Sequence, residues 1–261
     1  MPSNYAHYRF GVQALPMLPE AVQNRIGRYR SLYDVGLHGP DLFFYYDPLI
    51  HTRIGALGGA YHRLSGEEFF RRSVRRLRLN STAAAQAYLY GVLGHFALDS
   101  VCHPSVCAWN DSGRAGHVEI EVEFDRVLLE KDGKIPPHTQ DLTEHLRLNP
   151  EGWETIARFY PPAEARHIRR CLRNMVAFTR LLAAPEGLPR RVVQAGSVLA
   201  GEGRQMLMTA DVNPRCPWTG EELMPLYDRA LAQYPAMVRA LEGLIDGKDD
   251  TLGPEFAPNF G

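Results

Sequence analysis

The sequence predicts an all-α protein that folds as one compact helical bundle over residues 1–261. Apolar residues recur at helical spacing from end to end, with no run of evenly spaced strands and no alternation of strand and helix. The hydrophobic content of 45% supplies an ordinary globular core. The turn-rich segments, such as 131–141, do not have the composition of a linker, so a single domain is predicted.

The first helices are predicted from their start signals and apolar faces. Residues 18–33 place Pro19 near a helix start, where a missing backbone N–H is tolerated. Residues 65–79 begin with Ser65 and Glu68, which have capping-box spacing.

A long Ala-rich helix follows, and Ser81 or Thr82 can cap its N-terminus. We expect it to end before Pro104, because proline disfavours helical backbone in the preceding residue. Its most apolar window, residues 83–98, is too short and too often interrupted by polar groups to span a membrane. A buried core helix is predicted instead.

The helical remainder, residues 150–247, is predicted from three further segments. Helices are expected within residues 162–183, 189–207 and 219–245. In the last of these, Thr219 and Glu222 repeat the capping-box spacing.

Charge, termini and cysteines narrow the class of protein. The formal net charge of -1 lacks the basic excess of a protein that binds duplex nucleic acid. The N-terminus lacks the charged start and apolar core of a secretory signal, so a cytoplasmic location is predicted. The four cysteines show no C-x-x-C pair, and free, mostly buried thiols are expected.

The stretch "LGHFALDSVCHP" places His95, Asp99 and His103 four residues apart in an otherwise apolar helix. Each step of four drifts by only about 40°, so the three side chains project from one stripe. Burying such groups without partners would be costly. The spacing therefore predicts a row of metal ligands.

The stretch "GHVEIEVEFD" adds His117 and Glu121, again four residues apart. Its alternating pattern favours a strand, in which the two side chains would lie about 13 Å apart. In a helix they lie about 6 Å apart and can hold one ion. A shared metal therefore requires a helix at this point.

These motifs resemble those of the zinc-dependent phospholipase C family, which is related to the single-strand-specific zinc nucleases. The resemblance rests on H-x3-D-x3-H-P followed by H-x3-E, with "GPD" upstream and a lone histidine near the N-terminus, all within residues 1–130. It implies an all-α fold with three zinc ions at the bottom of a cleft.

The resemblance also implies a set of ligands. One zinc would be held by His95 and Asp99 together with Asp41 of "GPD" and a following histidine, for which His62 is preferred and His51 is the alternative. A second zinc would be held by His103, His117 and Glu121.

A third zinc would be held by His7 and the second oxygen of Asp99. In secreted members this ion also binds an N-terminal tryptophan, which the present sequence lacks. The amine of Pro2 after removal of Met1, or of Met1 itself, is the hypothesised substitute.

The function predicted from these residues is hydrolysis of a phosphate ester by a zinc-activated water, as in a phospholipase C. Asp41 is the candidate catalytic residue, which would orient or deprotonate that water. The substrate would be a phosphodiester, with phospholipids among the candidates. Alternatives are a nuclease or nucleotide phosphatase on the same zinc cluster, and a non-catalytic helical protein stapled by zinc.

The other histidines are given plainer interpretations. His38 is interpreted as a loop residue near the cleft, and His138, His145 and His167 as surface residues.

Overall fold

The computed structural model describes residues 4–48, 50–183 and 205–261, and all its regular elements in these ranges are helices. The α-helices are α1 (Asn4–Ala14), α2 (Glu20–Arg28), α3 (Arg30–Gly36), α4 (Leu57–His62), α5 (Gly66–Leu79), α6 (Ala83–Asp111), α7 (His117–Lys131), α8 (Pro150–Ala157), α9 (Ala165–Leu182) and α11 (Thr219–Asp246). The 3-10 helices are η1 (Leu15–Met17), η2 (Gly39–Tyr45), η3 (Pro137–Thr139), η4 (Glu144–Leu146) and η6 (Pro254–Phe256).

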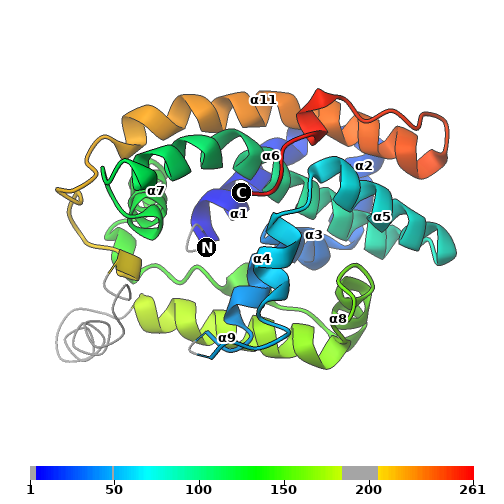
Figure 1. The fold of residues 1–261 in the computed structure, drawn as a ribbon, viewed down its shortest axis with the longest axis horizontal. Coiled ribbons are helices and arrows are strands. Elements are labelled where there is room, and N and C mark those ends of the chain that lie inside the picture. Colours follow the sequence, from blue (N-terminus) through cyan, green and yellow to red (C-terminus); the bar gives the residue numbers. More distant parts are fainter. Residues whose placement is uncertain (1–3, 49, 184–204) are drawn as a thin grey trace.

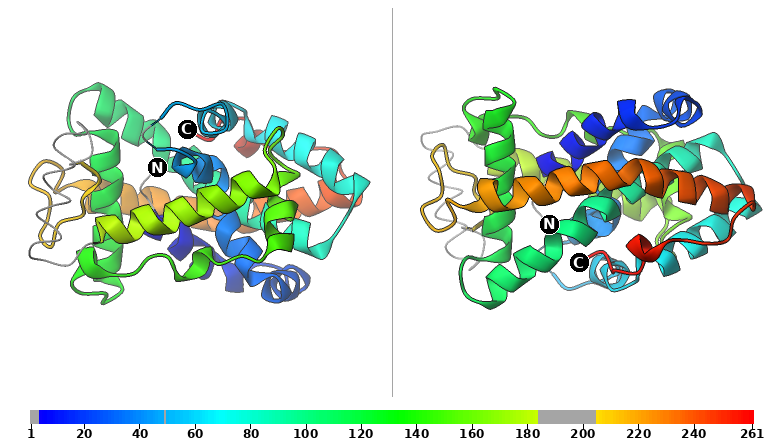
Figure 2. Two further views of the ribbon diagram at one scale, coloured as in Figure 1. Left: turned by 90° about the horizontal axis from the view of Figure 1, so that it is seen from below. Right: turned by 90° about the horizontal axis from the view of Figure 1, so that it is seen from above.

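Helix α6 forms the centre of the molecule. It packs mainly against α3 and α11, and α11 lies on the opposite side of the molecule from α8 and α9 (Figure 1 and Figure 2). The contact with α3 depends on two glycines. A Cβ on Gly91 would lie 2.2 Å from the carbonyl oxygen of Tyr33, and one on Gly36 would lie 2.5 Å from that of Tyr88.

The start of α6 agrees with the prediction, and its end does not. The hydroxyl of Thr82 accepts a hydrogen bond from Ala85 N at 3.1 Å and caps the helix. The helix then continues through Pro104 to Asp111. A proline removes one backbone hydrogen bond, but contacts of the following turns offset the loss, including the Trp109 ring 4.7 Å from that of Trp218.

The segment predicted as one helix over residues 18–33 is instead two. Helices α2 and α3 meet at Tyr29, whose backbone (φ -129°, ψ 40°) is not helical. The break redirects α3 onto α6, which local propensity does not encode.

The two predicted capping boxes differ in outcome. Ser65 accepts a hydrogen bond from Glu68 N at 3.1 Å, so α5 is capped as predicted. Thr219 is already the first residue of α11, and its hydroxyl donates to the carbonyl oxygen of Cys216. The prediction that Thr219 caps this helix is therefore wrong. Of the helix predicted over residues 189–207, all but the last three residues lie outside the described residues.

Helix α7 resolves the conflict between strand and helix in favour of helix. Ile120, Phe124 and Leu128 are buried at a spacing of four, which matches one helical face. The alternating glutamates therefore point to different sides of α7. None of the described helices is both long enough and apolar enough to span a membrane.

Candidate metal centre

The three side chains predicted as ligands on α6 lie along one face of the helix, with His95 and Asp99 buried and His103 partly buried. His95 Nε2 lies 3.0 Å from Asp99 Oδ2, one helical turn along α6. His103 Nε2 lies 3.5 Å from the other oxygen of the same carboxylate. Since His95 and Asp99 are almost completely buried, the three groups form a polar strip inside an apolar core.

Helix α1 brings His7 to the same carboxylate. His7 Nε2 lies 3.3 Å from Asp99 Oδ1, and the His7 and His95 rings are 4.4 Å apart. Both side chains are buried. Asp99 therefore has an imidazole facing each of its two oxygens.

The 3-10 helix η2 places Asp41 opposite the end of α4. Asp41 Oδ1 lies 3.0 Å from His62 Nε2, and His62 Nδ1 is 2.8 Å from the carbonyl oxygen of Gly58. That hydrogen bond leaves Nε2 facing Asp41, as a metal-ligating histidine requires. His51, the alternative ligand, is exposed and is not in this group.

Gly39 of the "GPD" motif is required by the backbone. Its φ of +47° is in the left-handed region, which glycine adopts without penalty. A Cβ there would lie 2.5 Å from His95 Cδ2. The glycine thus lets η2 approach α6 closely enough for Asp41 to reach His95.

Helix α7 supplies the remaining predicted ligands. Glu121 Oε1 lies 3.2 Å from His117 Nε2 and 3.3 Å from His103 Nε2. The His117 side chain is 29% exposed, whereas that of Glu121 is 7% exposed. The cluster is therefore most accessible to solvent at His117.

Donor atoms converge at three places among the described residues, within 4.8 Å of one another in each group. The three groups are His7, His95 and Asp99; Asp41, His62 and His95; and His103, His117 and Glu121. Two ligands bonded to zinc at about 2.0–2.1 Å in a tetrahedral arrangement lie about 3.3 Å apart. The nitrogen-to-oxygen distances of 3.0–3.5 Å above fit that ion.

The electrostatic surroundings of Asp41 and Asp99 keep both carboxylates charged, which favours the binding of a cation. Burial alone would raise the pKa of Asp99, but the imidazoles of His95 and His103 hold that pKa well below its usual range. Burial likewise opposes ionisation of Asp41, whose pKa is nevertheless lowered, with His62 contributing. Both carboxylates are therefore ionised at neutral pH and available as ligands.

Asp125 is a positioning residue that sequence reasoning missed. Its carboxylate accepts hydrogen bonds from the backbone N–H groups of Tyr5 and Ala6, at 3.0 and 2.8 Å, and so fixes the first turn of α1. Burial raises the pKa of Asp125 to about 7. The sequence signal that could have identified Asp125 is its position four residues after Glu121, on the same helical face.

The interpretations of His138 and His145 as surface residues are wrong. His138 is buried, at 4% exposure. His38 lies in the turn between α3 and η2, as the loop interpretation expects, and its side chain is buried, at 2% exposure. His38 Nε2 is 2.7 Å from His145 Nε2, and the His145 ring stacks on Tyr8 at 4.1 Å. His145 is therefore half-buried rather than a surface residue.

Comparison with known families agrees with this geometry. The family model described as "Zinc dependent phospholipase C" matches residues 6–166, which contain all the predicted ligands. Searches of curated proteins and of solved structures found no match. The match covers more than half of the chain and agrees with the helical fold, so the chain belongs to the zinc-dependent phospholipase C family.

Proposed function

We propose that this protein is a zinc-dependent phosphoesterase that hydrolyses a phosphodiester bond. The observation that carries the proposal is the overlap of the donor groups, in which His95 belongs to two. Each group offers three donors among the described residues, whereas structural zinc sites are closed by four protein ligands. Open coordination positions are what a catalytic site requires.

The predicted ligands would hold up to three zinc ions. Asp41, His62 and His95 would hold one ion, with His103, His117 and Glu121 holding a second. His7 and Asp99 would hold a third. Bound zinc would supply Lewis acidity, making a water more acidic and neutralising charge on the phosphoryl oxygens. The Asp41 carboxylate, which His62 orients at 3.0 Å, would accept the proton of the attacking water.

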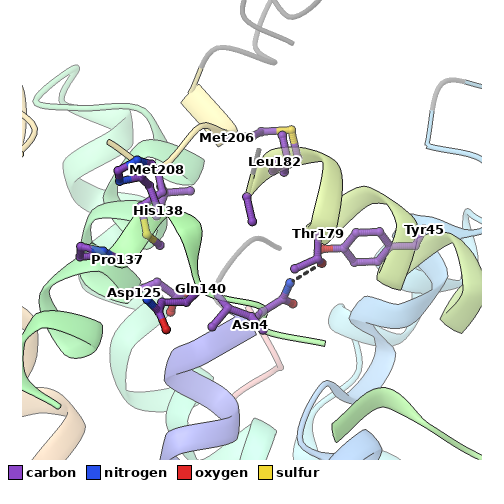
Figure 3. A pocket seen from close by; sticks show the side chains of 13 residues that line it. Asn4, Tyr45, Asp125, Pro137, His138, Gln140, Thr179, Leu182, Met206 and Met208 are labelled. Atoms are coloured by element: carbon purple, nitrogen blue, oxygen red, sulfur yellow. Dashed lines mark hydrogen bonds between the residues drawn. The ribbon is translucent and has the colours of Figure 1, made fainter. Parts of the chain in front are cut away.

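A pocket beside the cluster supports a substrate with an apolar part. Figure 3 shows Asn4, Tyr45 and Asp125 in its wall. These residues lie three or four positions from the predicted ligands His7, Asp41 and Glu121, respectively, which is about one helical turn. The rest of the wall is largely apolar and includes Leu142, Leu182, Met206 and Met208. Such a lining favours the apolar part of a phospholipid over a nucleotide base.

A nuclease or nucleotide phosphatase built on the same cluster is the second candidate. It would require aromatic platforms for bases, and among the described residues of the pocket wall Tyr45 and His138 carry aromatic rings. A non-catalytic role for the zinc would instead leave the protein without turnover.

The test is a turnover assay with three substrates: phosphatidylcholine in mixed micelles, single-stranded DNA and a small chromogenic phosphodiester. We expect release of phosphocholine by the zinc-loaded protein and at least a 100-fold loss in Asp41→Asn, roughly the contribution of general-base catalysis. His51→Gln, at an exposed histidine outside the groups, is the matched control. Cleavage of DNA alone would favour the second candidate, and zinc binding without any turnover would contradict an enzymatic role.

A further inference from the structure

The C-terminal segment 254–261, here called the tail segment, lies against two helices that carry or adjoin predicted ligands. Phe260 N donates a hydrogen bond to the carbonyl oxygen of His62 at 3.1 Å, and Gly66 N donates to that of Pro258 at 2.8 Å. Ser65 and Asn259 form an isolated antiparallel bridge. The tail segment therefore crosses the junction of α4 and α5, and its end lies toward one face of the molecule (Figure 1 and Figure 2). It lies outside the region that the family model matches.

The Phe260 ring contacts the rings of two predicted ligands. It is fully buried and stacks on His95, with ring centroids 6.0 Å apart and planes 29° apart. The same ring meets His62 nearly edge-on at 6.4 Å. Its other aromatic neighbours are Phe69, Phe70 and Phe96.

Among the residues that the structure describes, His95 has no hydrogen bond of the kind that usually orients a metal ligand. Metal-bound histidines generally donate their second ring N–H to a carbonyl or carboxylate, as His62 does to Gly58. No group in the described part of the chain makes a hydrogen bond to His95 Nδ1, although this atom is buried. The orientation of the His95 ring therefore depends on packing, between Gly39 on η2 and Phe260 on the tail segment.

The residue after Phe260 lies against the other donor group. A Cβ on Gly261 would lie 2.1 Å from His103 Nδ1, and Gly261 has a φ of +137°. His103 presents its opposite nitrogen, Nε2, to Glu121 and Asp99. The tail segment thus contacts ligands from all three groups, since His95 belongs to two of them.

We propose that Phe260 is a positioning residue for the metal centre, which holds the rings of His95 and His62 in the orientation that lets them bind zinc together with Asp41. The proposal rests on the proposed function, since it assumes that this group binds zinc. It assigns the tail segment a role in metal affinity as well as in the core.

The experiment compares Phe260→Leu with Phe256→Leu in the full chain. Phe256 is the matched control because it belongs to the same tail segment and is also fully buried, but its aromatic contacts are with Phe70 and Phe96. Urea unfolding of the zinc-free proteins measures the packing loss. Competition with a chromophoric chelator measures the dissociation constant for zinc.

We expect both variants to lower the urea midpoint, but only Phe260→Leu to weaken the binding of one zinc ion, by about 10-fold. Unchanged zinc affinity in Phe260→Leu, or equal weakening in Phe256→Leu, would show that Phe260 acts only in the core. Absence of zinc binding by the wild type would overturn the proposed function together with this inference. If Phe260→Leu does not fold, Phe260→Met is judged by the same criterion.

Discussion

Asp99 and His95 face each other across one turn of α6, with Asp99 Oδ2 3.0 Å from His95 Nε2 and the other carboxylate oxygen turned toward His7. Each oxygen of this carboxylate thereby faces the ring of a different histidine. This arrangement makes Asp99 the residue whose charge the proposed metal centre needs most.

Asp99→Asn is therefore expected to reduce zinc content by more than one ion per chain and to lower phosphodiester turnover by at least 100-fold. The amide keeps the shape of the side chain but removes the charge that offsets two cations. Elemental mass spectrometry and the turnover assay, run on the same preparation, measure both effects. Full zinc content with unchanged turnover would remove Asp99 from the mechanism.

Glu121→Gln should weaken one zinc ion only, because Glu121 belongs to a single donor group. Glu119→Gln is the matched control on the same helix. Glu119 accepts a hydrogen bond from Asn213 instead of facing the ligands. Zinc titration of both variants separates the roles, and equal losses in the two would contradict the assignment of Glu121.

Gly39→Ala should lower the free energy of unfolding by about 2–3 kcal/mol, since the left-handed backbone costs about 1–2 kcal/mol for alanine and the methyl group meets the His95 ring. Gly113→Ala is the control, because its φ is +72° but a Cβ there would meet nothing within 4 Å. Urea denaturation should show a lower free energy of unfolding in both variants. Zinc titration should show weaker zinc binding in Gly39→Ala alone. Identical behaviour of the two would mean that η2 moves away freely.

The fold became predictable where a local pattern and a tertiary requirement agreed. Thr82 caps α6 because its hydroxyl satisfies an N-terminal N–H whatever packs around it. The same local logic fails at Pro104, where the packing of Trp109 on Trp218 extends the helix. The break at Tyr29 likewise depends on where α3 must pack, which no local signal encodes.

The donor groups were likewise predictable only where the residues lie on one helix. Spacing on single helices predicted the pairs of His95 with Asp99 and of His117 with Glu121, because helical geometry alone brings such residues together. Contacts between distant segments, such as Phe260 on His95, have no signature in sequence spacing. The single domain and the cytoplasmic location stay predictions.

A pH dependence should come from His145, which is half-buried against His38 outside the donor groups. Burial, with a contribution from the positive charge of Arg30, lowers the pKa of His145 to about 4. Between the unfolded-state pKa of about 6.5 and pH 4, the unfolded chain takes up a proton that the folded chain does not. Stability due to His145 is therefore lost as the pH falls through this window.

His145→Gln should remove part of this loss. Between pH 6.5 and 4.5 it should lose about 2 kcal/mol less unfolding free energy than the wild type. Urea denaturation at the two pH values measures the difference, with His51→Gln as the control at an exposed histidine. A pH dependence identical to that of the wild type would show that His145 is protonated in the folded protein.

The converging histidines and carboxylates are proposed to bind zinc. The most direct measurement is the metal content of protein purified without added metal or a histidine tag, by elemental mass spectrometry. Two or three zinc ions per chain are predicted, since three donor groups converge and two of them share His95. No bound metal, and none taken up on titration with zinc, would contradict the claim and leave the buried carboxylates of Asp41 and Asp99 without an explanation.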